Sequence, residues 1–210
     1  MTRGKFITLE GGEGAGKSTQ AALLVDYLTT QGIKAIATRE VGGTPGAEEI
    51  RQLWLHKDAQ HWDVLTEVLL IMAARREHLV KKIWPALEAG TWVISDRYVD
   101  STRVYQGLVL GLGLAKIDAL YQEIAGSFWP DLTLLLDLPV EISLARVQAR
   151  KGIDDRFQQQ NIEFHQNLRD GFSTLYAVEP QRINRIEANN TIETMAKLVR
   201  DAIQPLQAKV

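Results

Sequence analysis

The segment Gly11–Ser18 constrains the fold of this chain more than any other feature of the sequence. It fits the pattern G-x-x-x-x-G-K-[ST], follows the apolar run Phe6–Leu9 and precedes an amphipathic pattern over Thr19–Thr30. Glycines in such a strand–loop–helix unit let backbone N–H groups turn inward around phosphate oxygens, and the start of the helix adds its dipole. The alternative is a glycine-rich turn with no ligand, but the complete motif in this context favours a phosphate-binding loop.

The polar residues of the loop have separate expected roles. Lys17 is expected to bridge the β and γ phosphates of ATP, and the Ser18 hydroxyl is expected to complete the coordination of Mg²⁺. The expected ATP-binding residues are Gly11, Gly12, Glu13, Gly14, Ala15, Gly16, Lys17, Ser18 and Thr19. The motif also fits GTPases, motor ATPases and small-molecule kinases, so other residues must identify the acceptor.

Short apolar runs alternate with longer helical patterns along the chain. The runs are Phe6–Leu9, Ala35–Ala37, Trp92–Ile94, Leu132–Leu136 and Arg182–Ile186. Strands of a parallel sheet read as short apolar runs because helices cover both faces of the sheet. We predict an α/β fold with a five-stranded parallel sheet flanked by helices.

Composition limits the remaining possibilities. The 210 residues are 45% hydrophobic and 24% charged, which suits one domain over residues 1–210. The formal net charge of −2 provides no overall positive field, so we expect no nucleic-acid partner. The chain has no Cys, which excludes disulfides and thiolate chemistry and favours a reducing compartment, the cytoplasm. We expect no signal peptide and no membrane segment, because no long apolar span occurs.

Helical patterns fill the spaces between the strands. A long amphipathic helix is predicted over Asp63–Ala89, with a kink at Pro85 near its end and Gly90 as its stop. A second helical pair is predicted over Val140–Lys151 and Ile162–Tyr176, and a terminal helix over Thr191–Gln207. The polar stretch 152–161 between the paired helices is predicted to be a mobile lid.

Arginines and carboxylates follow two of the predicted strands. Asp96 and Arg97 come directly after Trp92–Ser95, and Arg39 and Glu40 follow Ala35–Ala37. The carboxyl ends of parallel strands meet at one edge of a sheet, where open α/β folds bind ligands. Each arginine alone could be a structural ion pair, but the shared placement favours a second phosphate and a metal near the P-loop.

Two further groups of side chains carry weaker signals. Ile71 and Arg75 are spaced to share a helix face, which could bind a base, although spacing alone favours core packing with a surface arginine. Arg146 and Arg150 also share a face, and Arg156 lies in the lid, so lid closure would bring positive charge onto the transferred phosphoryl group. Solvated surface charge is the alternative for these three.

No histidine is assigned a catalytic role. His56, His61, His78 and His165 show no metal-ligand spacing, and no Ser or Thr is paired with a histidine base. This pattern suits a phosphate oxygen as nucleophile, because a phosphomonoester is already largely ionised at neutral pH. Positioning and charge neutralisation then remain as the tasks of the protein.

Several separate motifs together resemble those of the bacterial thymidylate kinases, over nearly the whole chain. They are Leu9–Thr19 (LEGGEGAGKST), Thr38–Thr44 (TREVGGT), Asp96-Arg97-Tyr98 with Ser101-Thr102, Tyr105-Gln106-Gly107, Pro130–Thr133, Leu136–Pro139 and Asp155-Arg156. The resemblance implies a nucleoside-monophosphate kinase fold, a homodimer, and the reaction dTMP + ATP → dTDP + ADP in dTTP biosynthesis. A deoxynucleoside kinase or another nucleotide kinase, and an ATP-dependent switch without turnover, remain the alternatives.

The resemblance also implies roles for individual residues. Arg97 and Arg39 would bind the acceptor phosphate, Arg75 and Gln106 the thymine edge, and Thr102 would border the base. Tyr105 would exclude a ribose 2′-hydroxyl, and Glu13 would lie near the 3′-hydroxyl of the sugar. Asp96 would orient Mg²⁺ or its waters, and Arg150 and Arg156 would bring charge to the phosphoryl group.

The chain departs from the family pattern at a few positions. Val41 replaces a usual Pro, and Gln158 replaces an acidic residue of the lid. Ile71 stands where many members stack thymine on Phe, so we expect the base to pack on an aliphatic surface.

Overall fold

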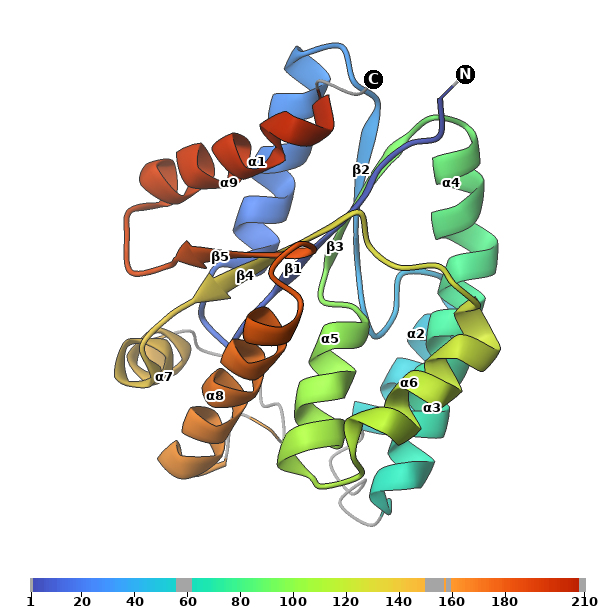
Figure 1. The fold of residues 1–210 in the computed structure, drawn as a ribbon, viewed down its shortest axis with the longest axis vertical. Helices are drawn as coiled ribbons and strands as arrows, with labels where there is room; N and C mark the ends of the chain where they lie inside the picture. The colour runs from blue at the N-terminus through green and yellow to red at the C-terminus, as the bar shows by residue number, and fades with distance from the viewer. Residues whose placement is uncertain (1, 56–61, 150–156, 158–159, 208–210) are drawn as a thin grey trace.

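A computed structural model describes residues 2–55, 62–149, 157 and 160–207. Its centre is a five-stranded, all-parallel sheet with the strand order β2-β3-β1-β4-β5 (Figure 1). The strands are β1 (Phe6–Glu10), β2 (Ala35–Arg39), β3 (Trp92–Asp96), β4 (Leu132–Asp137) and β5 (Ile183–Glu187). The predicted fold class, an α/β fold with a five-stranded parallel sheet, is confirmed.

Helices cover both faces of this sheet. One face carries α1 (Lys17–Thr30) and α9 (Ile192–Gln207), which pack against each other (Figure 1). Ile7 and Leu9 of the central strand β1 point into this layer with Leu24 and Leu28 of α1. Because strand side chains alternate between faces, Phe6, Thr8 and Glu10 point to the other layer.

The other described helices lie in the opposite layer, except α7 (Val140–Ala149), which lies beside the phosphate-binding loop. Those of the opposite layer are α2 (Pro45–Leu55), α3 (Val64–His78), η2 (Leu79–Ile83), α4 (Trp84–Glu88), α5 (Val99–Thr102), η3 (Arg103–Val109), α6 (Leu114–Ala125) and α8 (Ile162–Val178). Of these, α3 contacts α2 and α6, and α8 contacts η3, β4 and β5. The sequence patterns did not locate α2, α5, η3 or α6.

The predicted long helix forms as a continuous helical run with a change in the middle. Asp63 caps it by accepting hydrogen bonds from the Leu65 and Thr66 N–H groups at 3.0 and 3.3 Å. The run changes from α3 to the π-helical segment η2 and back to α4, whose first turn contains Pro85. A proline has no N–H to donate to the preceding turn, and the wider π-helical turn of η2, just before Pro85, accommodates it.

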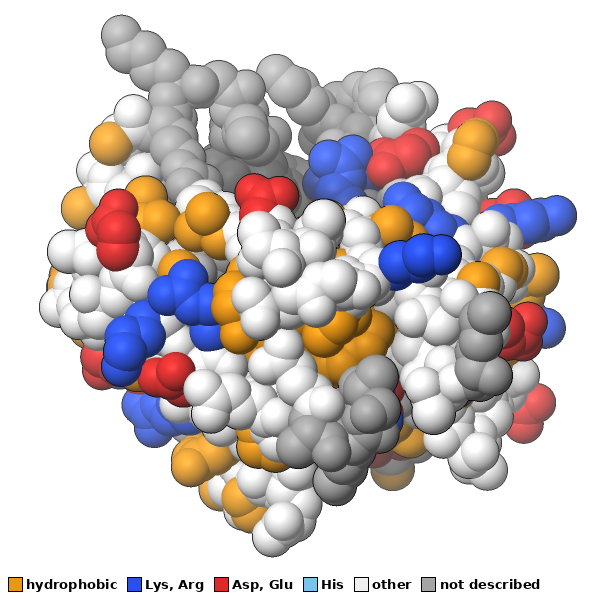
Figure 2. All heavy atoms as spheres, turned by 90° about the horizontal axis from the view of Figure 1, so that it is seen from above, with side chains coloured by type: hydrophobic (Ala, Val, Ile, Leu, Met, Phe, Trp, Pro, Cys, Tyr) orange, Lys and Arg blue, Asp and Glu red, His pale blue; other side chains and the backbone are white. Residues whose placement is uncertain are grey.

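Figure 2 shows the molecule from above, the side on which α1, α9 and α4 lie in Figure 1. Lys and Arg side chains lie among Asp and Glu side chains on this face rather than in one continuous patch. Among the residues that the structure describes, none of the helices is long and apolar enough to span a membrane.

Candidate active site

The phosphate-binding loop follows β1 and leads into α1, as predicted. Gly11 has a φ of 128°, and a Cβ there would lie 2.4 Å from the Leu136 carbonyl oxygen, so only glycine fits against β4. Lys17 begins α1 and donates from Nζ to the carbonyl oxygens of Gly11 and Gly12 at 3.2 and 2.8 Å. The loop therefore holds its lysine close to the backbone groups that would surround a phosphate.

The environment of Lys17 disfavours its positive charge. Its side chain is buried, which lowers the pKa, and the neighbouring Arg97 lowers it further. Glu13, Asp96 and Glu10 act in the opposite direction but do not restore the ordinary value. A polyphosphate bound in the loop would supply negative charge where two cations now lie close together.

Arg97 occupies the sharp turn after β3. It has a φ of 68°, which non-glycine residues rarely adopt, and its N–H donates to the Leu9 carbonyl oxygen at 2.9 Å. Its guanidinium donates to the Gly11 carbonyl oxygen at 3.0 Å and to Ser101 Oγ at 3.1 Å, and forms an ion pair with Glu13. The turn thus directs Arg97 toward the phosphate-binding loop.

The Arg97–Glu13 pair is electrostatically strong. The charge of Arg97 is the main reason why the pKa of Glu13 is lowered to about 2, with Lys17 adding to the effect against the opposing effect of burial. Burial alone would lower the pKa of Arg97, but Tyr105, Glu13 and nearby carboxylates outweigh burial and raise it. Both groups are therefore ionised across the physiological pH range.

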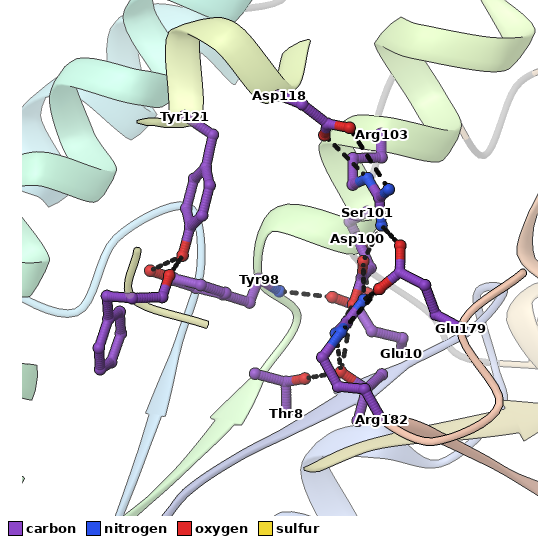
Figure 3. A network of polar contacts seen from close by, with 12 residues as sticks. Thr8, Glu10, Tyr98, Asp100, Ser101, Arg103, Asp118, Tyr121, Glu179 and Arg182 are labelled. Atoms are coloured by element: carbon purple, nitrogen blue, oxygen red, sulfur yellow. Dashed lines mark hydrogen bonds and ion pairs between the residues drawn. The ribbon is translucent and has the colours of Figure 1, made fainter. Parts of the chain in front are cut away.

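A buried polar network beside this turn links it to neighbouring strands and helices (Figure 3). Glu10, at the end of β1, accepts hydrogen bonds from the Tyr98 N–H at 2.8 Å and from Ser101 Oγ at 2.6 Å. Asp100 accepts from both terminal nitrogens of Arg182, at 2.7 and 2.9 Å. Burial, together with the charge of Asp100, raises the pKa of Glu10 to about 7. The network ties α5 to β1 and to the start of β5.

A second buried cluster lies on α3. Arg75 is 2% exposed, donates from Nε to Glu40 at 2.7 Å, and donates from Nη2 to Thr102 Oγ1 at 3.0 Å. The other Glu40 oxygen lies 3.0 Å from His78 Nδ1. Burial opposes the charge of Arg75, but Glu40 outweighs it and keeps the pKa above its ordinary value. The alternative of a surface arginine is therefore wrong for Arg75.

Glu40 lines the same cavity as the phosphate-binding loop, as expected, but it is engaged in a buried ion pair. We expected two carboxylates, Asp96 and Glu40, near the phosphates and a metal. Glu40 instead follows β2 as a buried partner of Arg75 and His78, so Asp96 is the carboxylate that faces the loop. Ser18 Oγ donates a hydrogen bond to Asp96 Oδ2. In the part of the chain that the structure describes, no cluster of three or more His, Asp or Glu could hold a metal.

One cavity of about 300 Å³ brings these groups together. Of the predicted site residues, Glu13, Gly14, Gly16, Lys17, Ser18, Thr19, Arg39, Ile71, Arg75, Asp96, Arg97, Thr102, Tyr105 and Gln106 line it. Gly11, Gly12 and Ala15 belong to the loop but do not line the cavity. Arg150 and Arg156 lie outside the described residues.

Two arginines named from the sequence take different positions, Arg39 in the cavity lining and Arg146 beside the phosphate-binding loop. The Arg39 side chain is 55% exposed at the edge of the cavity and is paired with Glu48 at 3.0 Å. Arg146, on α7, donates to the carbonyl oxygens of Gly14 and Ala188, each at 3.4 Å. Arg146 thus contacts the phosphate-binding loop itself.

Sequence reasoning missed several cavity residues. They are Val41, Arg51, Trp54, Tyr98, Ser101, Val147 and Phe157. Arg51 and Trp54 come from α2, whose start is marked by Thr44 and Pro45, a cap and a first helical residue that could have located it. Phe157 packs against Trp54 and Tyr105, with ring centroids 6.0 and 5.2 Å apart. These aromatic contacts depend on tertiary structure and have no local signal.

A phosphate-binding loop that faces a second group of arginines across one cavity defines a P-loop kinase with a phosphate-bearing acceptor. The sequence pattern of the thymidylate kinase family matches residues 9–199. The chain belongs to the thymidylate kinase family.

Individual relatives support this assignment. The chain is 47% identical to the thymidylate kinase of Alkalilimnicola ehrlichii, covering 97% of this chain and 94% of the relative. It is 45% identical to that of Rhodopseudomonas palustris (97% and 90% covered) and 44% identical to that of Shouchella clausii (98% and 96% covered). The predicted enzyme class and activity, phosphorylation of dTMP by ATP, are confirmed.

Proposed function

We propose that the residues of this cavity carry out a direct, in-line transfer of the γ-phosphoryl group from ATP to the phosphate of dTMP. An acceptor phosphate oxygen forms the new bond to the γ-phosphorus, and the bond between that phosphorus and the β–γ bridging oxygen breaks, releasing ADP. The observation that carries the proposal is the convergence of Lys17, Arg97 and Arg75 on one cavity. No covalent enzyme intermediate is needed, because the acceptor phosphate is itself the nucleophile.

The two phosphates are held by different parts of the site. Lys17 and the loop backbone bind the β and γ phosphates, with the start of α1 adding its dipole. Arg97 binds the acceptor phosphate, assisted by Arg39 from the edge of the cavity. Since Arg97 already contacts Gly11 and Glu13 of the loop, it is placed between donor and acceptor, where charge develops during transfer.

The residues also fit Mg²⁺. Ser18 and Asp96 offer a hydroxyl and a carboxylate oxygen in direct contact, which are the hard oxygen ligands that Mg²⁺ prefers, and the phosphates would complete the set. When bound, Mg²⁺ neutralises charge on the β and γ phosphates. The lack of a larger carboxylate cluster among the described residues suits a cation bound mainly through its substrate.

The far end of the cavity recognises the nucleoside. Arg75 donates to the thymine O4, Gln106 contacts the neighbouring ring nitrogen, and Thr102 borders the base. Ile71 is 2% exposed and gives the base an aliphatic surface. Tyr105 excludes a ribose 2′-hydroxyl, and Glu13 accepts a hydrogen bond from the sugar 3′-hydroxyl. This set explains selection for a deoxyribose monophosphate.

Lid closure completes the charge of the site. Arg150 precedes the predicted lid over residues 152–161 and Arg156 lies within it. The described residues Val147, before the predicted lid, and Phe157, within it, line the cavity and support this proposal. We expect these arginines to act on the transferred group, as the sequence predicts.

The enzyme acts as a homodimer that pairs through α2 and α3. These helices pack against each other and expose large apolar side chains, Leu53 (49%), Leu65 (37%) and Leu69 (50%). Leu65 and Leu69 are spaced to share a face of α3. A second copy of the chain covers this apolar surface. Sedimentation velocity of the wild type and of Leu69→Glu tests the proposal, since the wild type should be dimeric and the variant monomeric.

A coupled ADP-release assay with a substrate panel tests the activity and its specificity. The panel holds dTMP, dUMP, dCMP, dAMP, dGMP and thymidine, each with ATP and Mg²⁺. We expect strong preference for dTMP. Preference for another monophosphate would refute the assignment of Arg75 and Gln106 to thymine, and no turnover with any acceptor would favour an ATP-dependent switch.

A further inference from the structure

A buried carboxylate lies directly behind Gln106. Glu67, in the first turn of α3, is 4% exposed and is not among the described residues that line the cavity. Gln106 is 2% exposed, lines the cavity from η3, and donates from Nε2 to Glu67 Oε2 at 3.4 Å. Through this hydrogen bond, Glu67 is linked to a residue that lines the cavity.

This contact fixes which end of the Gln106 amide faces the cavity. A side-chain amide has a donor end and an acceptor end of nearly the same shape, so its orientation is set by its partners. In the structure a carboxylate oxygen of Glu67 accepts from Gln106 Nε2, so the NH₂ end of the amide faces Glu67. Turning the amide by 180° would place the Gln106 carbonyl oxygen against the Glu67 carboxylate, with two acceptors in contact.

The backbone of Gln106 is fixed as well. Its carbonyl oxygen accepts from the Leu112 N–H at 3.0 Å, and the next residue, Gly107, accepts from the Gly113 N–H at 2.8 Å. In the described part of the chain, no hydrogen bond to Gln106 Oε1 occurs. The carbonyl oxygen of the amide is thus available to a ligand, while its nitrogen is held by Glu67.

The oriented amide and Arg75 present a defined pattern to a base. An acceptor from Gln106 and a donor from Arg75 match the N3–H and O4 of thymine or uracil. Cytosine presents the opposite pattern, an N3 acceptor and an N4 amine donor. We propose that Glu67 is a specificity-determining residue that orients Gln106 and so excludes cytosine; this rests on the proposed function, in which Gln106 and Arg75 contact the base.

The test compares kcat/KM for dTMP, dUMP and dCMP in the wild type and in Glu67→Gln. The substitution keeps the shape but lets the Gln106 amide adopt either orientation. We expect kcat/KM for dTMP and dUMP to fall together and the dTMP-to-dCMP ratio to fall about tenfold or more, because mispaired buried polar groups lose discrimination. Glu77→Gln, on the same helix but away from the cavity lining, should leave the ratio unchanged.

Several outcomes distinguish the inference from its alternatives. A folded Glu67→Gln variant with an unchanged ratio, or with all three substrates reduced equally, would overturn it and leave Glu67 a structural residue. If Glu67→Gln does not fold, Glu67→Asp is the second variant. Its shorter side chain keeps a carboxyl group but moves the oxygen away from Gln106, so the dTMP-to-dCMP ratio of kcat/KM should also fall. Gln106→Leu distinguishes the proposed thymine contact of Gln106 from the proposed orienting role of Glu67. An unchanged dTMP-to-dCMP ratio in that variant refutes the thymine contact itself. If only Gln106→Leu lowers the ratio, the role of Glu67 alone is refuted.

Discussion

The ion pair between Glu40 and Arg75 gives the sharpest prediction about stability. Both side chains are almost completely buried, with exposed fractions of 2% and 1%, and the other Glu40 oxygen contacts His78. The substitution Glu40→Gln keeps the shape and one acceptor but removes the negative charge. The guanidinium of Arg75 then remains buried without a counter-charge.

The expected cost follows from this burial. Breaking a buried ion pair on one side costs about 3–5 kcal/mol, because the remaining charge keeps its desolvation penalty. The neighbouring pair Arg39–Glu48 is a matched control, since its side chains are 55% and 33% exposed. Glu48→Gln should cost about 0–1 kcal/mol, as exposed pairs do.

Urea unfolding followed by tryptophan fluorescence measures the difference. With a slope of about 3 kcal/mol per M, Glu40→Gln should lower the midpoint by about 1–2 M. Glu48→Gln should lower it by about 0.3 M or less. The double variant Glu40→Leu with Arg75→Met should regain most of the stability, because an apolar pair has no charge to desolvate, but should lose recognition of dTMP.

The reasoning would be refuted by equal midpoint shifts for Glu40→Gln and Glu48→Gln. Such a result would mean that water reaches Arg75 and compensates its charge. A double variant as unstable as Glu40→Gln would show that packing at this position, rather than charge, determines the cost.

Three further predictions concern the phosphates and pH. Lys17→Ala should lower kcat by several orders of magnitude, with little loss of thermal stability because burial already disfavours the charged lysine; wild-type turnover would contradict the phosphate-binding role. Arg156→Ala should mainly lower kcat in steady-state assays, and an unchanged kcat would make Arg156 a surface residue. Glu13→Gln should be less stable than wild type above pH 4.5, the unfolded pKa of Glu13. That difference should vanish as the pH falls toward about 2, because the stabilisation from the lowered pKa disappears when Glu13 is protonated; urea unfolding at several pH values measures it, and a pH-independent difference would contradict it.

Features with a local signal could be predicted from the sequence. The phosphate-binding loop was recognised because its glycines, its lysine and its flanking strand and helix are contiguous. The three inner strands, β1, β3 and β4, were recognised because burial on both faces requires apolar runs, whereas the edge strands β2 and β5 are partly exposed and were recognised from their apolar positions alone. The placement of Asp96 and Arg97 followed from the rule that ligands bind at the carboxyl ends of parallel strands.

Features that depend on partners distant in sequence could not be predicted. Spacing favoured a surface position for Arg75, but the buried carboxylate of Glu40 from another element makes its burial possible. The contact between Glu67 and Gln106 joins two helical segments that no sequence pattern relates. Charge partners across the core leave no periodic signal, so the sequence cannot show which polar residues are paired.

The central position of β1 determines when during synthesis the nucleotide site can form. Phe6 pairs with Val93 of β3, and Ile7 with Leu132 of β4, so β1 has no partner strand until β3 has been synthesised and has both only after β4. Contacts of this kind are closed late, because long loops must be ordered first. A nascent chain that ends before β4 lacks one of the two strands that flank β1. We therefore expect nucleotide binding only after the chain has been synthesised through β4, which ends at Asp137, well after the motif that carries the binding.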